Sequence, residues 1–85
     1  MLAKFDIDPK LKIKLRDNDA YVEFNDQDRL DNMSYRAYND PQYWWVILHA
    51  NDYQIEFDIE AGELLRIPFP LESALNDLGV LNATI

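Results

Sequence analysis

The run from Asp40 to Asn51 constrains this chain most, because it gathers both tryptophans, the only histidine and an unbroken apolar block. Asp40 and Pro41 are typical of a helix start, since aspartate caps helices and proline is tolerated at the first helical position. A helix from here to about Ala50 would be apolar around more than half of its circumference. One sheet face cannot cover such a helix. We therefore expect a second cover, from the N-terminal segment, the C-terminal tail or another subunit.

Another helix, of about ten residues, is expected just before this run, beginning near Arg29. Its apolar and small residues recur at helical spacing, namely at Leu30, Met33, Ser34, Ala37 and Tyr38. Asp28 precedes this stripe, and we expect it to cap the helix.

Two short strands are expected on either side of these helices, at residues 21–24 and 64–67. They would pair antiparallel beneath the helices. Between the second helix and the second strand, Ile55, Phe57 and Ile59 alternate with acidic residues, which predicts an extended segment with one buried side. The expected fold class is therefore α+β, with a β-α-α-β core and a two-stranded antiparallel sheet.

The two ends of the chain are expected to be extensions of this core. Residues 11–15 alternate Leu-Lys-Ile-Lys-Leu, which is typical of a lysine-protected edge strand and equally of an arm that adds a strand to a neighbour. Residues 71–79 predict a short helix with Gly79 as its C-cap. The chain is accordingly divided into a basic arm or edge strand (1–20), the core domain (21–68) and a C-terminal extension (69–85).

The composition of the 85-residue chain argues against several classes of function. Sixteen acidic against eight basic residues give a net charge of −8, which opposes binding to nucleic acid. The charge is uneven, because residues 1–16 carry +3 and the remainder −11. Without cysteine, and with one histidine, we expect no disulfide, metal or cofactor site. No apolar run approaches the roughly 20 residues that span a bilayer, and no signal peptide is recognisable.

Catalytic chemistry is not expected either. Ser34 and Ser73 are the nucleophile candidates beside His49, but neither serine lies in a Gly-x-Ser-x-Gly turn. His49 near a helix end is more typical of a residue that interacts with the helix dipole or packs. Only Gly62 and Gly79 are available, so a glycine-rich phosphate loop is excluded.

Several of these residues together resemble a LysM domain over roughly residues 21–68. The matching positions are Asp28-Arg29-Leu30, Met33-Ser34, Tyr38, Trp45 to Ile47, Ala50-Asn51 and Gly62-x-Leu64-x-x-Ile67-Pro68. A narrower pattern resembles the LysM-like baseplate wedge proteins of contractile-tailed bacteriophages. It consists of Tyr38-Asn39-Asp40-Pro41, Tyr43-Trp44-Trp45-Val46-Ile47, Ala50-Asn51 and Leu65-Arg66-Ile67-Pro68.

The resemblance implies a structural subunit of the virion tail baseplate, made in the host cytoplasm. Its partners would be other baseplate, sheath or hub proteins in a symmetric assembly. A peptidoglycan- or chitin-oligosaccharide-binding LysM module is the alternative, and an adaptor of a cellular injection system is a third. Gln27 in place of the usual glycine, and a long acidic connection from Asn51 to Gly62, favour assembly over glycan binding.

These patterns assign a core and an interface. Of the two indoles, we expect Trp45 to face the core and Trp44 to face a neighbour. The expected core contains Leu30, Met33, Ala37, Trp45, Leu48, Leu64 and Ile67. The expected protein interface contains Tyr43, Trp44, Tyr53, Phe69, Leu71, Leu75, Leu78, Lys10, Lys12 and Lys14.

Overall fold

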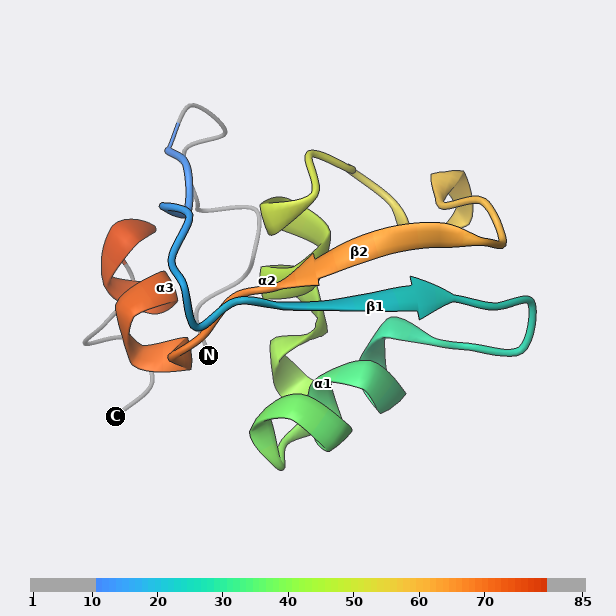
Figure 1. Cartoon of the computed structure of the whole chain (residues 1–85), viewed down its shortest axis with the longest axis horizontal. Coiled ribbons are helices and arrows are strands. Elements are labelled where there is room, and N and C mark those ends of the chain that lie inside the picture. Colours follow the sequence, from blue (N-terminus) through green and yellow to red (C-terminus); the bar gives the residue numbers. More distant parts are fainter. Residues whose placement is uncertain (1–10, 80–85) are drawn as a thin grey trace.

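The computed structural model describes residues 11–79 and has an α+β architecture (Figure 1). The elements in chain order are β1 (Ala20–Phe24), α1 (Leu30–Tyr38), the 3₁₀ helix η2 (Pro41–Tyr43), α2 (Trp44–Ala50), the 3₁₀ helix η3 (Glu56–Asp58), β2 (Glu63–Ile67) and α3 (Leu71–Asp77). The expected α+β class with a β-α-α-β core is confirmed. No helix within residues 11–79 is long and apolar enough to cross a membrane.

The sheet consists of β1 and β2, which pair antiparallel as expected; Ala20 lies opposite Ile67. Successive strand residues point to opposite faces, so Leu65 and Ile67 both point toward the helices and are buried. Leu64 lies on the other face and is 64% exposed. The prediction that Leu64 belongs to the core was therefore wrong, and Leu65 takes that place.

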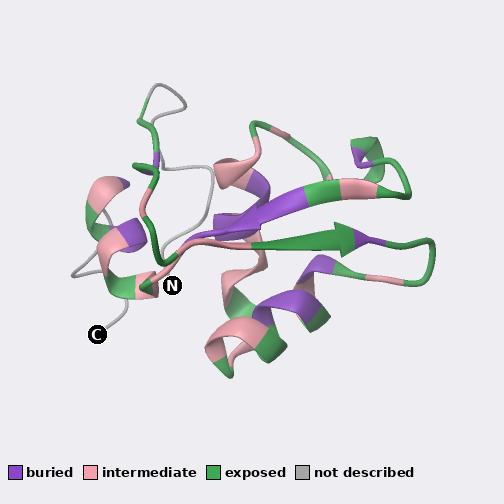
Figure 2. Cartoon of the chain, viewed as in Figure 1, coloured by how far each residue is buried: buried purple, intermediate pink, exposed green. Residues whose placement is uncertain are grey.

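One hydrophobic cluster fills the space between the sheet and the helices α1 and α2. We call it the first cluster; it consists of Phe24, Leu30, Met33, Ile47, Leu48, Ile59, Leu65 and Ile67. The predicted core residues Leu30, Met33, Leu48 and Ile67 are all buried here, and Ala37 packs against them partly buried. Figure 2 shows these buried positions on α1, α2 and β2, whereas most of β1 is exposed.

A second cluster lies on the other flank of α2. It consists of Ile13, Val46, Ala74, Leu75 and Leu78, with Tyr43, Trp45, Ala50 and Leu71 packed against it. The second cover that α2 requires is thus supplied by the N-terminal segment and α3. We call residues 11–19 together with α3 the annex.

Both tryptophans pack against a hydrophobic cluster, so Trp45 lies against the core as predicted, whereas Trp44, predicted to face a neighbour, also packs within the chain. Trp44 packs partly buried against the first cluster, and Trp45 packs partly buried against the second. Trp44 is three and four residues before Ile47 and Leu48, so the three side chains share one helix face. Trp45 lies with Val46 on the flank that the annex covers.

Two predicted helix caps have different outcomes. Asp40 accepts a hydrogen bond from the backbone N–H of Gln42 (2.9 Å), which confirms it as the cap of η2. Asp28 does not cap α1. The backbone N–H of Leu30 instead donates to Glu56 Oε2 (3.0 Å), so a carboxylate from η3 satisfies the start of α1.

The connection between α2 and β2 also differs from the prediction. It contains η3 rather than an extended segment, and a turn of three residues breaks the alternation of the apolar side chains. Ile59 is buried in the first cluster, while Ile55 is exposed and Phe57 is 92% exposed.

Residues 11–16 form no strand, so the predicted edge strand is not present there. Of the alternating apolar residues only Ile13 is buried; Leu11 and Leu15 are exposed. His49 Nε2 donates to the carbonyl oxygen of Leu11 (2.7 Å), which ties this segment to the end of α2. Lys10, with the rest of the predicted arm before residue 11 and the tail after residue 79, lies outside the described residues.

Candidate functional site

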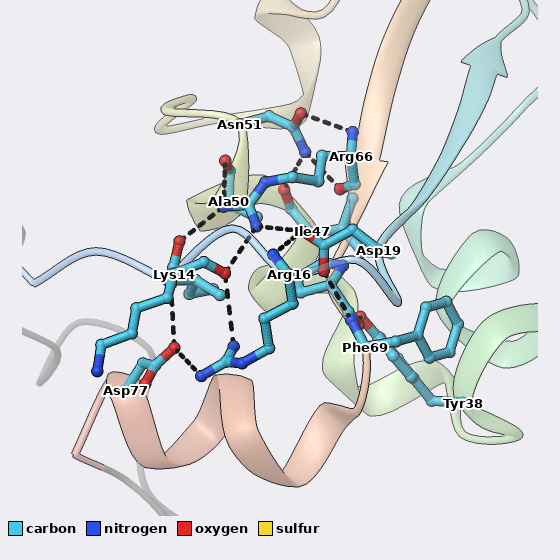
Figure 3. Close-up of polar contacts among 12 residues, drawn as sticks. Lys14, Arg16, Asp19, Tyr38, Ile47, Ala50, Asn51, Arg66, Phe69 and Asp77 are labelled. Atoms are coloured by element: carbon cyan, nitrogen blue, oxygen red, sulfur yellow. Dashed lines mark hydrogen bonds and ion pairs between the residues drawn. The ribbon is translucent and has the colours of Figure 1, made fainter.

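A buried polar junction centred on Arg66 joins the annex to the core domain (Figure 3). Arg66 lies on the face of β2 that points away from the helices, yet it is only 9% exposed because residues 13–19 cover it. Its Nη1 donates to Asp19 Oδ2 (2.8 Å) and to the Lys14 carbonyl (3.2 Å). Its Nη2 donates to the Ile13 carbonyl (2.8 Å). The carbonyl oxygens of Ile13 and Lys14 are therefore bonded by the Arg66 guanidinium and not by a neighbouring strand.

Asp19 is the buried anion of this junction, with its side chain 1% exposed. Besides Arg66, it accepts hydrogen bonds from the backbone N–H groups of Arg16 (3.1 Å) and Phe69 (3.1 Å). Burial by itself raises the pKa of Asp19, but these hydrogen bonds and the Arg66 charge together outweigh burial and hold the pKa below its ordinary value. An ionised Asp19 thus connects the N-terminal segment, β2 and the residues leading to α3.

Asn51 supports Arg66 from behind. Its Oδ1 accepts from the backbone N–H of Arg66 (2.8 Å), and its Nδ2 donates to the backbone carbonyls of Arg66 (2.9 Å) and Ile47 (2.7 Å). One side-chain amide therefore joins the last turn of α2 to the middle of β2.

A second ion pair fixes α3 to the N-terminal segment. Asp77 Oδ2 accepts from Arg16 Nη2 (2.8 Å) and from the Lys14 backbone N–H (3.0 Å), and the Asp77 side chain is mostly buried. The pair between Lys12 and Asp52 (2.8 Å) is largely exposed to solvent instead.

The junction has its polar groups fully used within the chain. Among residues 11–79, every buried side-chain nitrogen and oxygen has a hydrogen-bond partner, and no group of three or more acidic, histidine or cysteine residues could hold a metal ion. Ser34 Oγ donates to the Asp40 carbonyl, and His49 donates to Leu11. The candidate catalytic side chains Ser34 and His49 are therefore each hydrogen-bonded to a backbone carbonyl.

Two predicted interface residues are not available on the surface. Leu75 and Leu78 are buried in the second cluster because α3 turns them toward α2. Tyr43 and Leu71 pack against the same cluster and are partly buried. The interface prediction was therefore wrong for Leu75 and Leu78, which belong to the core.

The remaining predicted interface residues lie at least partly at the surface. Trp44, Tyr53 and Phe69 pack partly buried around the first cluster. The Tyr53 hydroxyl donates to Glu63. Lys12 and Lys14 are exposed on the annex.

A different set of large apolar side chains is strongly exposed. It comprises Leu15 on the annex, Tyr21 and Leu64 on the sheet, Tyr35 on α1, and Ile55 and Phe57 around η3. We call the sheet face that carries Tyr21 and Leu64 the outer sheet face. These two side chains occupy diagonal positions across the strand pair, where long side chains come within reach of each other. Strand alternation could have found Leu64, since Ile67 was already assigned to the core.

An apolar groove runs between β1 and α1. Its volume is about 280 Å³, and it is lined by Ala20, Val22, Met33, Arg36, Ala37, Ile67 and Phe69. Val22 lies opposite the buried Leu65 but is 40% exposed, because the groove leaves it uncovered.

A polar depression of about 590 Å³ lies at the other end of the sheet, between the β1–α1 loop and the turn before β2. Its lining consists of Glu23, Asn25, Asp26, Gln27, Asp28, Ala61 and Gly62. The lining holds three carboxylates, so the depression is acidic as well as open.

Comparison of the chain with protein-family models, with curated proteins and with solved structures gives no match.

Proposed function

We propose that this chain is a structural subunit of a contractile phage tail baseplate, which holds neighbouring baseplate, sheath or hub proteins together through protein–protein contacts. The proposal rests on the resemblance over residues 21–68. The observation that supports it best is the exposure of large apolar side chains on the annex, the outer sheet face and η3. Such residues on separate sides of a small domain suit a subunit that contacts several neighbours at once.

The junction supports the same role, because it makes the annex a fixed part of the subunit. Arg66 and Asp19 hold residues 13–19, and Asp77 holds α3. A connector that is already ordered loses less conformational entropy when it binds its neighbours. The three exposed apolar regions would then be presented at fixed relative positions.

Assembly of particles with a substituted outer sheet face tests the proposal. Leu64→Asp keeps the fold, since this side chain is already exposed, but it places a charge in the proposed contact. We expect purified particles to contain fewer copies of the Leu64→Asp chain than of the wild type, by mass spectrometry. Asn32→Asp, at an exposed position on α1 outside these three regions, is the matched control. If particles purified from the wild type do not contain this chain, the proposal is contradicted.

A second candidate function is binding of peptidoglycan or chitin oligosaccharides. The polar depression is the observation that favours it, because its carboxylate and amide groups can bond to sugar hydroxyls. Retention of the isolated protein on insoluble cell wall, competed by soluble N-acetylglucosamine oligomers and lost in Asn25→Ala, would support this alternative. We expect no such retention.

A further inference from the structure

We propose that copies of this chain associate head to tail, with Phe57 of one copy inserted into the groove between β1 and α1 of the next. The first partner in this contact is the η3 turn, and the second is the groove lined by Val22, Met33, Ala37 and Phe69. The inference does not depend on the proposed function, because it concerns only contacts between copies of this chain.

Phe57 is presented on an anchored turn. The turn closes with hydrogen bonds from Asp58 N to the Ile55 carbonyl (3.2 Å) and from Ile59 N to the Glu56 carbonyl (3.0 Å). On one side of Phe57, Glu56 accepts from the start of α1; on the other, Ile59 is buried in the first cluster. Phe57, between these two anchors, is 92% exposed. An aromatic side chain held in place like this loses little entropy on binding, and aromatic residues in pockets dominate many interfaces.

The groove suits an aromatic side chain in size and in character. Its volume of about 280 Å³ is at the lower end for ligand pockets, and its lining is apolar apart from Arg36. The uncovered position of Val22, on the sheet face that points toward the helices, marks where the core is incomplete. A phenyl ring placed there would remove apolar surface of both copies from water.

Charge complementarity identifies a second copy as the occupant. Arg36 is the charged residue of the groove lining, and its side chain is 62% exposed with Asp28 at 3.7 Å. The Arg36 guanidinium can therefore bind a further anion. Phe57 is followed by Asp58 and Glu60, both exposed. These carboxylates would approach Arg36 as the ring enters the groove, which fixes the orientation of the contact.

The two surfaces lie on different sides of the molecule. The groove lies along β1 and α1, whereas η3 lies beyond the β2 side of the sheet (Figure 1). In a dimer of this kind, one copy keeps a free groove and the other keeps a free Phe57. Further copies can therefore add, which gives a ring or an open chain. Because a single side chain and its surroundings bury little area, the association is expected to be weak in solution.

Sedimentation equilibrium of the full chain provides the test. We expect the average mass of the wild type to rise above that of a monomer as the concentration approaches about 1 mM. Phe57→Asp removes the inserted side chain, and we expect it to lower the association constant at least about tenfold. Ala37→Trp fills the groove and should have the same effect. Gln54→Ala, in the same loop as Phe57, is the control and should associate like the wild type.

Mixing the two variants tests the head-to-tail arrangement itself. The Phe57→Asp chain keeps its groove, and the Ala37→Trp chain keeps its Phe57. An equimolar mixture should therefore form dimers of one chain of each kind and nothing larger. Circular dichroism of each variant establishes that it is folded. Arg36→Glu provides a second route if Ala37→Trp does not fold: it should weaken association, and Arg36→Glu with Asp58→Arg should restore it.

Three results would overturn the proposal. The first is a wild type that stays monomeric up to about 1 mM. The second is a pair of folded variants that associate as the wild type does. The third is loss of association on filling the groove but not in Phe57→Asp, since the groove would then hold a different occupant.

Discussion

The two flanks of α2 are both covered, but in different ways. The flank that carries Ile47 and Leu48 meets the sheet and α1, and the buried side chains that fill that cluster are all apolar. The flank that carries Val46 meets two segments from opposite ends of the described chain, and a buried ion pair beside it holds those segments in place. The comparison teaches that a helix apolar around most of its circumference needs a second cover, and that a small chain can supply it from its own ends.

The largest expected effect comes from removing the cation of the junction. Arg66→Met should destabilise the protein by about 3–5 kcal/mol, because it leaves the buried Asp19 carboxylate without its partner. Urea denaturation measures the change. Arg66→Lys keeps the charge but cannot reach Asp19 and the Ile13 carbonyl in the same way, so we expect an intermediate loss. A loss below about 1 kcal/mol for Arg66→Met would show that the annex does not need the junction.

Equivalent truncations in the two clusters compare the flanks directly. Leu65→Ala and Leu75→Ala each remove the same atoms from a buried site, and each should cost about 2–5 kcal/mol. We expect Leu65→Ala to speed amide hydrogen exchange throughout the chain, and Leu75→Ala to speed it mainly in α3 and residues 11–16. Equal acceleration everywhere by Leu75→Ala would mean that the two flanks unfold as one unit.

A pH titration isolates the contribution of Asp19. Its pKa is lowered in the folded state, so the stabilisation is fully present above the unfolded pKa of about 3.9 and is lost as the pH falls through the folded pKa. The wild type should therefore be more stable than Asp19→Asn at pH 7, and the difference should shrink below about pH 4. Other carboxylates titrate in both proteins, so the difference between the two curves is the quantity to measure. A difference that is constant with pH would contradict the lowered pKa.

The smallest expected effect is at the exposed edge of the annex. Lys12 and Asp52 form an ion pair whose side chains are both mostly exposed, so Lys12→Ala should change the free energy of unfolding by about 0–1 kcal/mol. Added salt should reduce even that difference. A larger loss would indicate that Lys12, and not Arg66, holds the N-terminal segment.

Sequence periodicity predicted the helices and the two strands, because each element depends on residues close together in the chain. The misplacement of Leu64 was avoidable, since strand alternation already pairs Leu65 with Ile67. The packing of Trp44 within the chain was harder to foresee, because both flanks of α2 are apolar and their covers come from segments distant in the sequence.

The junction could not be predicted from local patterns. Arg66 and Asp19 are 47 residues apart, and Arg66 follows the exposed Leu64 on a strand face that looks solvent-facing. The capping of α1 by Glu56, 26 residues away from Leu30, is of the same kind. Such pairs become visible only when the fold brings the segments together.

The position of Ile13 tests the central claim most directly, namely that the chain covers both flanks of its own central helix. In the free monomer, nuclear Overhauser effects should connect the Ile13 methyl groups with methyl groups of the second cluster, such as those of Val46 and Leu75. Dilute samples exclude contacts between molecules. Random-coil chemical shifts for Ile13, with no such connections, would contradict the claim, because the second flank of α2 would then lack its N-terminal cover.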